Sequence, residues 1–275
     1  MKLNFYKYQG TGNDFILVDC RQSEEKIKNT FLFRKLCDRH FGIGADGIIF
    51  IQNDDNSDFY MKYCNSDGKE STMCGNGGRC AISFTKKLKI HNNKTHFRAI
   101  DGYHDGFIRN NQNKKDQDQD LVSINMINVD KNTIKIHPKY VFLNTGSPHH
   151  ILFVEKKEIK EKNVYKEGKK IRFQSPYLEQ GGVNVNFVKV LENNMLQVRT
   201  YERGVENETL SCGTGVVASV IAAYETHKIK NDLKKILVQT IGGKLWVSLT
   251  KTKDEYKNVS LTGNVELVFK GDILI

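Results

Sequence analysis

Long apolar runs are missing from this sequence of 275 residues: no stretch approaches the roughly 18 consecutive apolar residues that a membrane-spanning helix needs. The segment 1–6 also lacks the charged-then-apolar pattern of an export signal. We therefore expect a cytoplasmic protein without a membrane partner. Hydrophobic residues make up 39% of the chain, which is typical of globular proteins and allows one large domain or two modest ones.

Concentrated charge is also missing, although the net charge is 42 − 32 = +10. The lysines are dispersed in pairs such as Lys86–Lys87 and Lys234–Lys235, and no basic run carries interleaved aromatic residues. We therefore predict no nucleic-acid partner. A nucleic-acid binder driven by the +10 charge stays an alternative, which salt-dependent retention on DNA would test.

The six cysteines form no Cys-x-x-Cys pair and have no histidines at zinc-ligand spacing, so we predict no metal. A disulfide framework does not fit a cytoplasmic chain. Four of the six stand among apolar neighbours and are interpreted as small buried hydrophobes: Cys20, Cys37, Cys64 and Cys80. Cys74 and Cys212 stand in a different setting.

A repeat spans the chain. Residues 70–77 (ESTMCGNG) match residues 208–215 (ETLSCGTG) at an offset of 212 − 74 = 138, about half the chain length. Three further pairs follow in the same order, the first two at the same offset and the third at 134: Tyr63 with Tyr201, Gly44 with Gly182, and 11–13 with 145–147. Several ordered matches predict two homologous halves, each one structural unit.

The boundary between the halves is predicted from a polar segment, 110–120, which is interpreted as a linker or an exposed hairpin tip. The alternating segment 121–125 predicts a strand that pairs back onto 106–109. We therefore expect an N-terminal half, 1–126, to which a final strand, 265–275, returns. The C-terminal half is then 127–264.

In each half, the sequence predicts strands, then a loop that ends at the cysteine, and then a helix. The segment 216–224 is apolar on nearly all faces, which predicts a buried central helix. A helix over 79–88 in the first half is expected to be shorter and more polar at its end, and strands are expected at 59–63 and 196–201. The sequence thus predicts an α+β fold of two pseudo-symmetric domains, each a β-sheet or barrel wrapped around a central helix.

Both Cys-Gly-x-Gly motifs put a thiol at the start of a helix. Unpaired N–H groups and the helix dipole stabilise a thiolate there and can bind a carboxylate. Epimerisation needs a base on one face of the substrate Cα and an acid on the other, and two such thiols with coupled titrations supply both. The alternative is that both motifs are glycine-rich helix starts with incidental cysteines, which the repetition makes less favourable.

The chain resembles the diaminopimelate epimerase family across nearly its whole length. Five segments carry the resemblance: 10–15, 38–47, 65–68, 73–80 and 201–215. Proline racemases share the cysteine pair, but they carry His where this chain has Asn76 and lack the pair Glu202–Arg203.

The resemblance implies conversion of LL- to meso-diaminopimelate in lysine and peptidoglycan precursor biosynthesis, without pyridoxal phosphate, metal or another cofactor. It also implies that the protein is a homodimer. The only other binding partner that it implies is the small-molecule substrate. It assigns Cys74 and Cys212 as the catalytic acid–base pair and His149 and Glu202 as residues that tune the cysteine pKa values. The implied substrate contacts are Asn13, Asn65, Gly75, Asn76, Asn184, Glu202, Arg203, Gly213 and Thr214.

Five of these residues have a plainer alternative. Arg203 suits the distal carboxylate because a guanidinium binds it in bidentate fashion, but with Glu202 it could form a surface ion pair of little value. His149 could be a turn residue, and Asn13 and Asn184 could be turn formers.

Three departures from the family pattern concern the grip on substrate. Gly47 stands where some members carry Gln, Ser147 stands where many carry Asn, and the loop 204–209 is one residue longer than in some relatives. Two further functions stay open: a racemase for another amino acid, such as hydroxyproline, and a catalytically inactive binding protein.

Overall fold

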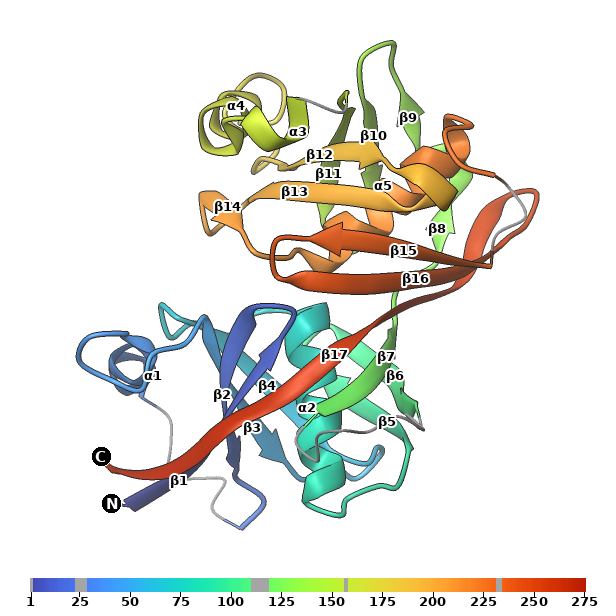
Figure 1. Ribbon diagram of the computed structural model, residues 1–275. Coiled ribbons are helices and arrows are strands. Elements are labelled where there is room, and N and C mark those ends of the chain that lie inside the picture. The colour runs from blue at the N-terminus through green and yellow to red at the C-terminus, as the bar shows by residue number, and fades with distance from the viewer. Residues whose placement is uncertain (1, 23–28, 110–118, 156–157, 231–233) are drawn as a thin grey trace. The chain divides into compact units, whose positions relative to one another are not determined.

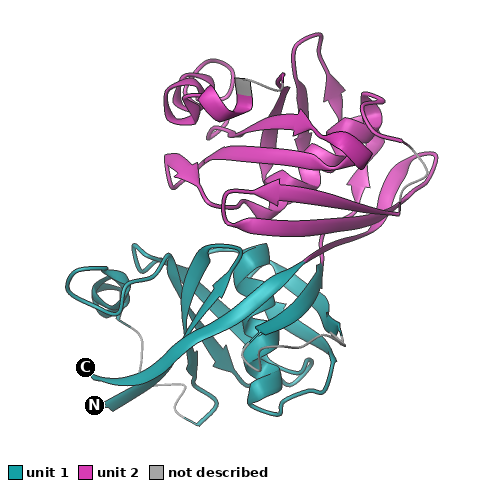
Figure 2. Ribbon diagram, viewed as in Figure 1, with its two compact units in different colours: residues 1–124, 263–275 teal, residues 125–262 magenta. Residues whose placement is uncertain are grey.

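The computed structural model describes residues 2–22, 29–109, 119–155, 158–230 and 234–275. The chain divides into two compact units (Figure 2): unit 1 comprises residues 1–124 and 263–275, and unit 2 comprises residues 125–262. The chain therefore passes between the units twice. Each crossing lies two residues from the boundaries expected from the sequence, 126/127 and 264/265.

Unit 1 is a closed barrel of eight strands (Figure 1). Neighbours pair in chain order from β1 to β7, and β17 pairs with both β7 and β1 to close the ring. The predicted pairing of 121–125 with 106–109 is confirmed, while residues 110–118 lie outside the described part of the chain. The strands are β1 (Lys2–Gly10), β2 (Asn13–Asp19), β3 (Gly47–Gln52), β4 (Tyr60–Asn65), β5 (Lys94–Ala99), β6 (Gly102–Arg109), β7 (Gln119–Asn125) and the later part of β17 (Glu255–Leu274).

Helix α2 (Gly75–Lys87) fills the barrel and is buried from Gly75 to Thr85. It begins four residues before the predicted start at Arg79, and its 13 residues equal those of the second central helix, so the prediction of a shorter helix is wrong. The glycines explain the error. They are weak helix formers, but a Cβ at Gly78 would lie 2.5 Å from the Ile124 Cδ1 atom, so glycine lets the helix pack closely against the barrel wall without moving that side chain.

Outside the barrel of unit 1, α1 (Thr30–Cys37) covers a second cluster of buried residues. The Asn29 side chain caps it by accepting from the N–H groups of Phe31 and Leu32. Cys20, Cys37, Cys64 and Cys80 are all buried as predicted. Burial raises the pKa of the Cys64 thiol to about 11, which keeps it protonated and unreactive at neutral pH.

Unit 2 repeats the strand pairing of unit 1. From β10 onward its pairs run antiparallel, parallel, antiparallel, parallel and antiparallel, the same series that runs from β1 to β6. The strands are β8 (Val129–Asp130), β9 (Lys135–Ile136), β10 (Val141–Asn144), β11 (Pro148–Phe153), β12 (Asn184–Val190), β13 (Leu196–Glu202), β14 (Asn207–Thr209), β15 (Lys235–Thr240), β16 (Gly243–Lys251) and the first part of β17.

The helix at the centre of unit 2 is α5 (Gly213–Glu225), which is buried along almost its whole length as the apolar segment 216–224 predicts. Shorter helices lie outside it: α3 (Glu158–Glu161), α4 (Val164–Arg172), and the single turns η1 (Lys131–Thr133) and η2 (Glu192–Asn194). The predicted α+β fold of two pseudo-symmetric domains, each wrapped around a central helix, is confirmed.

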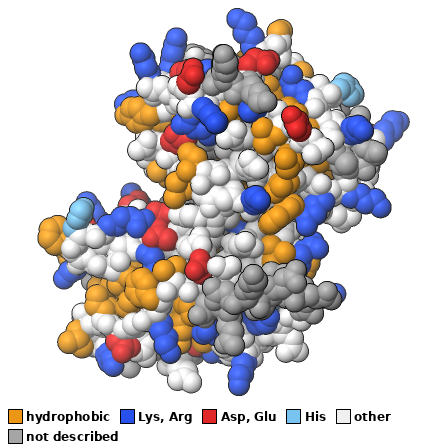
Figure 3. All heavy atoms as spheres, viewed as in Figure 1, with side chains coloured by type: hydrophobic (Ala, Val, Ile, Leu, Met, Phe, Trp, Pro, Cys, Tyr) orange, Lys and Arg blue, Asp and Glu red, His pale blue; other side chains and the backbone are white. Residues whose placement is uncertain are grey.

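None of the helices that the structure describes is long and apolar enough to cross a membrane. On the face shown in Figure 3, the Lys and Arg side chains are scattered among acidic and uncharged ones and do not gather into one patch. The dispersed charge expected from the sequence is therefore visible on this face.

Candidate active site

Each of the two candidate cysteines is the N-cap residue of the central helix in its unit. Cys74 precedes α2 with φ −88° and ψ 127°, and Cys212 precedes α5 with φ −115° and ψ 110°. Both residues are therefore extended and stand just outside the first helical turn. The N–H groups of that turn and the positive end of the helix dipole favour a negative charge beside each sulfur, whether a thiolate or a carboxylate.

In unit 1, three of the predicted site residues lie together. The Asn13 Oδ1 atom lies 3.3 Å from the Asn76 Nδ2 atom and 3.7 Å from the Cys74 Sγ atom, so it accepts from both. The Asn13 Nδ2 atom donates to the Asp46 Oδ2 atom at 2.5 Å. Because a carboxylate only accepts, Asp46 holds the amide of Asn13 with its oxygen toward the thiol.

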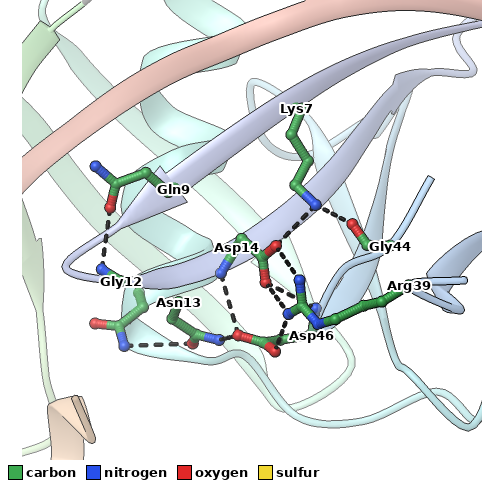
Figure 4. A network of polar contacts seen from close by, with 9 residues as sticks. Lys7, Gln9, Gly12, Asn13, Asp14, Arg39, Gly44 and Asp46 are labelled. Carbon is green, nitrogen blue, oxygen red and sulfur yellow. Dashed lines mark hydrogen bonds and ion pairs between the residues drawn. The ribbon is translucent and has the colours of Figure 1, made fainter. Parts of the chain in front are cut away.

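The position of Asn13 follows from a tight turn between β1 and β2. Thr11 and Gly12 adopt φ values of 58° and 83°, the left-handed conformation that a two-residue hairpin turn requires. The Gly12 N–H donates to the Gln9 Oε1 atom at 3.0 Å, which holds the turn (Figure 4). Asn13 is thus a strand residue directly after the turn, and the turn does not depend on its side chain.

A cluster of charges supports Asp46 (Figure 4). Arg39 bridges Asp14 and Asp46 at 2.7 and 2.8 Å, and Lys7 contacts both Asp14 and the Gly44 carbonyl. Burial acts to raise the pKa of Asp14, but hydrogen bonds and charge from Arg39 and Lys7 outweigh it and hold that pKa well below its usual range. Burial and the charge of Asp14 raise the pKa of Asp46.

Arg79 lies fully buried beneath the first turn of α2. Its guanidinium donates to the Asn76 Oδ1 atom at 2.6 Å and the Thr11 Oγ1 atom at 3.2 Å, and to the carbonyls of Gly75 and Asn264 at 3.3 and 3.4 Å. Burial lowers the pKa of Arg79 to about 10, so the group stays charged at neutral pH. Sequence reasoning missed this role, although one Arg between Gly78 and the buried Cys80 is an unusual signal.

Asn65 is exposed at the end of β4, where it accepts from the Tyr63 Oη atom at 2.8 Å. It pairs with Gly47 on β3. A Cβ at Gly47 would lie 2.6 Å from the Tyr63 ring and 2.7 Å from the Cys64 carbonyl oxygen. The packing around position 47 therefore explains why glycine stands there, because no side chain fits without movement of the backbone.

In unit 2, the Cys212 Sγ atom lies 3.5 Å from the Thr214 Oγ1 atom. The Thr214 hydroxyl in turn lies 3.0 Å from the His149 Nε2 atom and 3.1 Å from the Ser147 Oγ atom, and Ser147 lies 3.0 Å from the same His149 nitrogen. Serine at position 147 therefore joins Thr214 and His149 in one hydroxyl–imidazole triangle next to the thiol.

His149 is a buried strand residue on β11, and the alternative of a turn residue is wrong. Burial, with a smaller effect from the charge of Arg203, lowers the pKa of His149 to about 3, so the imidazole is neutral at pH 7. Its Nδ1 atom lies 2.9 Å from the Asn186 Nδ2 atom, and the Thr200 hydroxyl donates to the Asn186 Oδ1 atom at 2.9 Å. Sequence reasoning missed Asn186, two residues after Asn184 on β12.

Both the NH2 group and the oxygen of the Asn184 side chain form hydrogen bonds within unit 2. It donates to the Ser147 Oγ atom at 3.2 Å and the Pro148 carbonyl at 3.0 Å, and it accepts from the Arg203 N–H at 2.9 Å. The Arg203 side chain is exposed, and the Glu202 Oε2 atom accepts from the Thr209 hydroxyl at 2.8 Å. Asn184 therefore positions the Arg203 backbone and Ser147.

The remaining predicted residues lie in the first turns of the central helices: Gly75 and Asn76 in α2, and Gly213 and Thr214 in α5. Among the residues described, no group of three or more His, Cys, Asp or Glu side chains is arranged to hold a metal ion. Each unit thus carries its own polar cluster around one thiol at a helix start.

Comparison with known proteins identifies the family. A sequence profile described as diaminopimelate epimerase matches residues 5–105 and 141–268. A diaminopimelate epimerase from Flavobacterium psychrophilum is 49% identical over 98% of this chain and 100% of its own length. One from Aquifex aeolicus is 37% identical over 98% and 97%.

The chain belongs to the diaminopimelate epimerase family.

Solved structures extend the likeness of fold beyond that family. A phenazine biosynthesis protein of the PhzF family from Bacillus anthracis has a TM-score of 0.73 at 16% identity, with both chains fully covered. A hydroxyproline epimerase from Agrobacterium vitis, solved with trans-4-hydroxy-L-proline bound, has a TM-score of 0.68 at 12% identity over 99% of this chain and 92% of its own. At these identities the likeness concerns the two-domain fold, which the diaminopimelate epimerase family shares.

Proposed function

We propose that this chain converts LL-2,6-diaminopimelate into meso-diaminopimelate, with Cys74 and Cys212 as its two acid–base groups. The observation that carries the proposal is the repetition itself: each unit holds one thiol as the N-cap of a buried 13-residue helix. Membership of the family supports the reaction and the substrate. The product then serves lysine and peptidoglycan precursor biosynthesis.

In the proposed reaction, one cysteine thiolate removes the proton from the substrate Cα, and the electron pair of the broken C–H bond is delocalised toward the α-carboxylate. The other cysteine donates its thiol proton to the opposite face of the same carbon. The first sulfur ends as a thiol and the second as a thiolate, so protons and charge balance. Neither pyridoxal phosphate nor a metal takes part in this scheme, because the first-turn N–H groups of each helix stabilise negative charge beside the sulfurs.

Substrate contacts are proposed at the residues that surround these helix starts. Gly75, Asn76, Gly213 and Thr214 lie in the first turns, where backbone N–H groups suit the α-carboxylate. The exposed guanidinium of Arg203 suits the distal carboxylate. The further proposed contacts are Asn13, Asn65, Asn184 and Glu202. His149 and Glu202 are proposed to tune the cysteine pKa values.

A cytoplasmic homodimer without nucleic-acid or membrane partners completes the proposal. Apolar side chains on the C-terminal part of β17 are exposed, including Val268, Phe269 and Leu274. Such side chains are compatible with a subunit contact. Size-exclusion chromatography with light scattering tests the dimer, and retention on DNA at increasing salt concentration tests the alternative of a nucleic-acid binder.

The reaction is tested by incubating reduced, purified protein with LL-diaminopimelate in D2O and analysing both isomers early by mass spectrometry. We expect meso product with one deuterium at the epimerised Cα, because the donating thiol has exchanged with solvent. Recovered LL substrate keeps its hydrogen, since the thiolate returns the same proton. Trans-4-hydroxy-L-proline is the control substrate and should not turn over. Deuterium that enters LL substrate as fast as product forms would contradict the assignment of two separate bases.

A further inference from the structure

Asn186 and the imidazole of His149 form a buried polar pair behind the first turn of α5. Both side chains are fully buried, and the Asn186 Nδ2 atom lies 2.9 Å from the His149 Nδ1 atom. Between this buried amide and the imidazole, only two hydrogen-bond arrangements are possible. It either donates to an unprotonated Nδ1 atom or, with its amide flipped, accepts from a protonated one.

The start of α5 decides how the amide of Asn186 is oriented, because the Thr200 hydroxyl, 2.9 Å from the Oδ1 atom, could equally donate to an oxygen or accept from an NH2 group. The same oxygen lies against the start of α5, where a Cβ added to Gly215 would be 2.3 Å away. The positive end of a helix favours an oxygen over an NH2 group, so Oδ1 faces the helix and Nδ2 faces His149.

The tautomer of His149 follows from that orientation. The imidazole is neutral, because burial lowers its pKa to about 3, and it therefore carries one N–H group. Its Nδ1 atom accepts from Asn186, so the proton resides on Nε2. That nitrogen lies 3.0 Å from both the Thr214 and the Ser147 hydroxyl oxygens.

A second amide directs the Ser147 hydroxyl in the same sense. The Asn184 Nδ2 atom donates to the Ser147 Oγ atom at 3.2 Å, which leaves the Ser147 proton for Thr214 at 3.1 Å. The Thr214 hydroxyl then receives hydrogen bonds from its neighbours. Its own proton points to the Cys212 Sγ atom at 3.5 Å.

We propose that Asn186 is a positioning residue that fixes the Nε2–H tautomer of His149, so that the Thr214 hydroxyl donates to Cys212 and stabilises its thiolate. This inference deepens the function proposed above and rests on it. With the opposite tautomer, the unprotonated Nε2 atom would draw the Ser147 or Thr214 proton to itself and away from the sulfur. The hydrogen bonds of Asn186 go to His149 and Thr200 and not to the thiol.

The tautomer is measured directly by nitrogen-15 NMR of histidine-labelled protein, with His149 assigned among the eight histidines through the signals lost in His149→Gln. We expect an unprotonated Nδ1 atom and a protonated Nε2 atom in the wild type at pH 7. In Asn186→Asp the carboxylate can only accept, so the proton should move to Nδ1. Asn258→Asp, an exposed position on β17 with φ 51°, is the matched control and should leave the His149 signals unchanged.

Reactivity of the thiol gives a readout that does not depend on diaminopimelate. Iodoacetamide labelling of Asn186→Leu, resolved by peptide mass spectrometry, should be about tenfold slower at Cys212 because the thiolate has lost its donor. Labelling at Cys74 should not change and serves as the internal reference. In the epimerase assay, we expect kcat of Asn186→Asp to fall about 10- to 100-fold while KM changes little.

Several outcomes would overturn the inference. These are a protonated Nδ1 atom in the wild type, an unchanged tautomer in Asn186→Asp, or labelling of Cys212 in Asn186→Leu that is as fast, relative to Cys74, as in the wild type. The proposed reaction fails separately. Wild-type protein with the expected tautomer and labelling but no turnover of diaminopimelate would disprove the function and leave the positioning role of Asn186 in place.

Discussion

Behind the third residue of α2 lie two apolar side chains, whereas behind the third residue of α5 lie two polar ones. A Cβ at Gly77 would meet Ile49 and Phe15 at 3.2 and 3.3 Å, and a Cβ at Gly215 would meet Asn186 and His149 at 2.3 and 3.3 Å. Both glycines let the strands approach the helix. The two units therefore share a backbone arrangement but surround their cysteines with different chemistry.

The fifth residues of the two helices differ in the same way. Arg79 buries a charged guanidinium in unit 1, and Val217 occupies the corresponding position in unit 2. The side-chain contacts of the sulfurs also differ: the Asn13 oxygen accepts from the Cys74 thiol, while the Thr214 hydroxyl can donate to Cys212. A repeated fold thus provides two thiols with different hydrogen-bond surroundings.

The strongest test of the comparison removes one sulfur at a time. We expect Cys74→Ala and Cys212→Ala each to lower kcat by about 10³-fold or more, because a two-base reaction fails without either group. The double variant should be no worse than either single one. Initial rates with LL-diaminopimelate measure the loss. Cys37→Ala is a buried cysteine of unit 1 outside the site and should keep most activity; strong residual turnover in either site variant would contradict the assignment.

The second test concerns Arg79, the buried cation behind the cysteine of unit 1, whose counterpart in unit 2 is Val217. Arg79→Met should lower the free energy of unfolding by about 3 kcal/mol, because the oxygens of Thr11 and Asn76 and two carbonyls lose their buried donor. Urea denaturation measures the change. Arg34→Met, on the exposed side of α1, should change stability by less than about 0.5 kcal/mol. Equal effects would show that the guanidinium is not structural.

Much of this organisation is predictable from the sequence, because repeats and local patterns encode it. The offset between the two Cys-Gly-x-Gly motifs predicts two matching units, and the alternation in 121–125 predicts the pairing that joins Leu121 to Arg109. The placement of both cysteines at helix starts follows from the glycines after them. Short-range chemistry is sufficient for these features.

The positioning residues were not predictable, because long-range packing creates them. Asp46 is 33 residues from Asn13 in the sequence, and Asn186 is 37 residues from His149. No local spacing in the sequence predicts either contact. The start of α2 was missed for a related reason: glycine propensity argues against a helix at Gly75, but the space inside the barrel requires one there. The sequence predicts the reacting groups, and the sheet register determines what surrounds them.

Acid should destabilise unit 2 more than unit 1. His149 has a folded-state pKa of about 3 against 6.5 in the unfolded chain, so stability is present above pH 6.5 and is lost as pH falls toward 3. At pH 5 the loss is roughly 2 kcal/mol. His150, whose pKa burial lowers to about 4, adds to it. In unit 1, burial also lowers the pKa of His91, while the contribution of Asp14 is lost only below pH 3.8.

Hydrogen exchange resolves this difference when opening free energies are compared between pH 7.5 and pH 5. Amides of unit 2 should lose more protection than those of unit 1. His149→Gln should remove part of the pH dependence of unit 2 and leave that of unit 1 unchanged. A larger loss of protection in unit 1 would contradict the prediction.

The smallest expected effect concerns the acceptor that faces Cys74. In Asp46→Asn the new side chain can donate as well as accept, so it no longer forces the Asn13 oxygen toward the thiol. With its amide flipped, Asn13 presents NH2 to the sulfur and favours the thiolate. Cys74 should then react faster with iodoacetamide while Cys212 does not change, and kcat should fall about tenfold, as expected from one hydrogen bond of about 1.4 kcal/mol.

Loss of negative charge beside Arg39 is a second consequence of Asp46→Asn and has to be separated from the first. Arg39→Gln removes the same ion pair without altering the contact between Asn13 and Asp46, so it should change kcat and the labelling of Cys74 far less. Asp105→Asn, an exposed carboxylate on β6, controls for charge alone. Arg39→Gln removes a positive charge where Asp46→Asn removes a negative one, so if Arg39→Gln slows the labelling of Cys74 as much as Asp46→Asn accelerates it, the charge cluster sets the reactivity of Cys74 and the orientation of Asn13 does not. If Asp46→Asn accelerates that labelling and Arg39→Gln changes it little, the two thiols are distinguished by an acceptor on one side and a donor on the other.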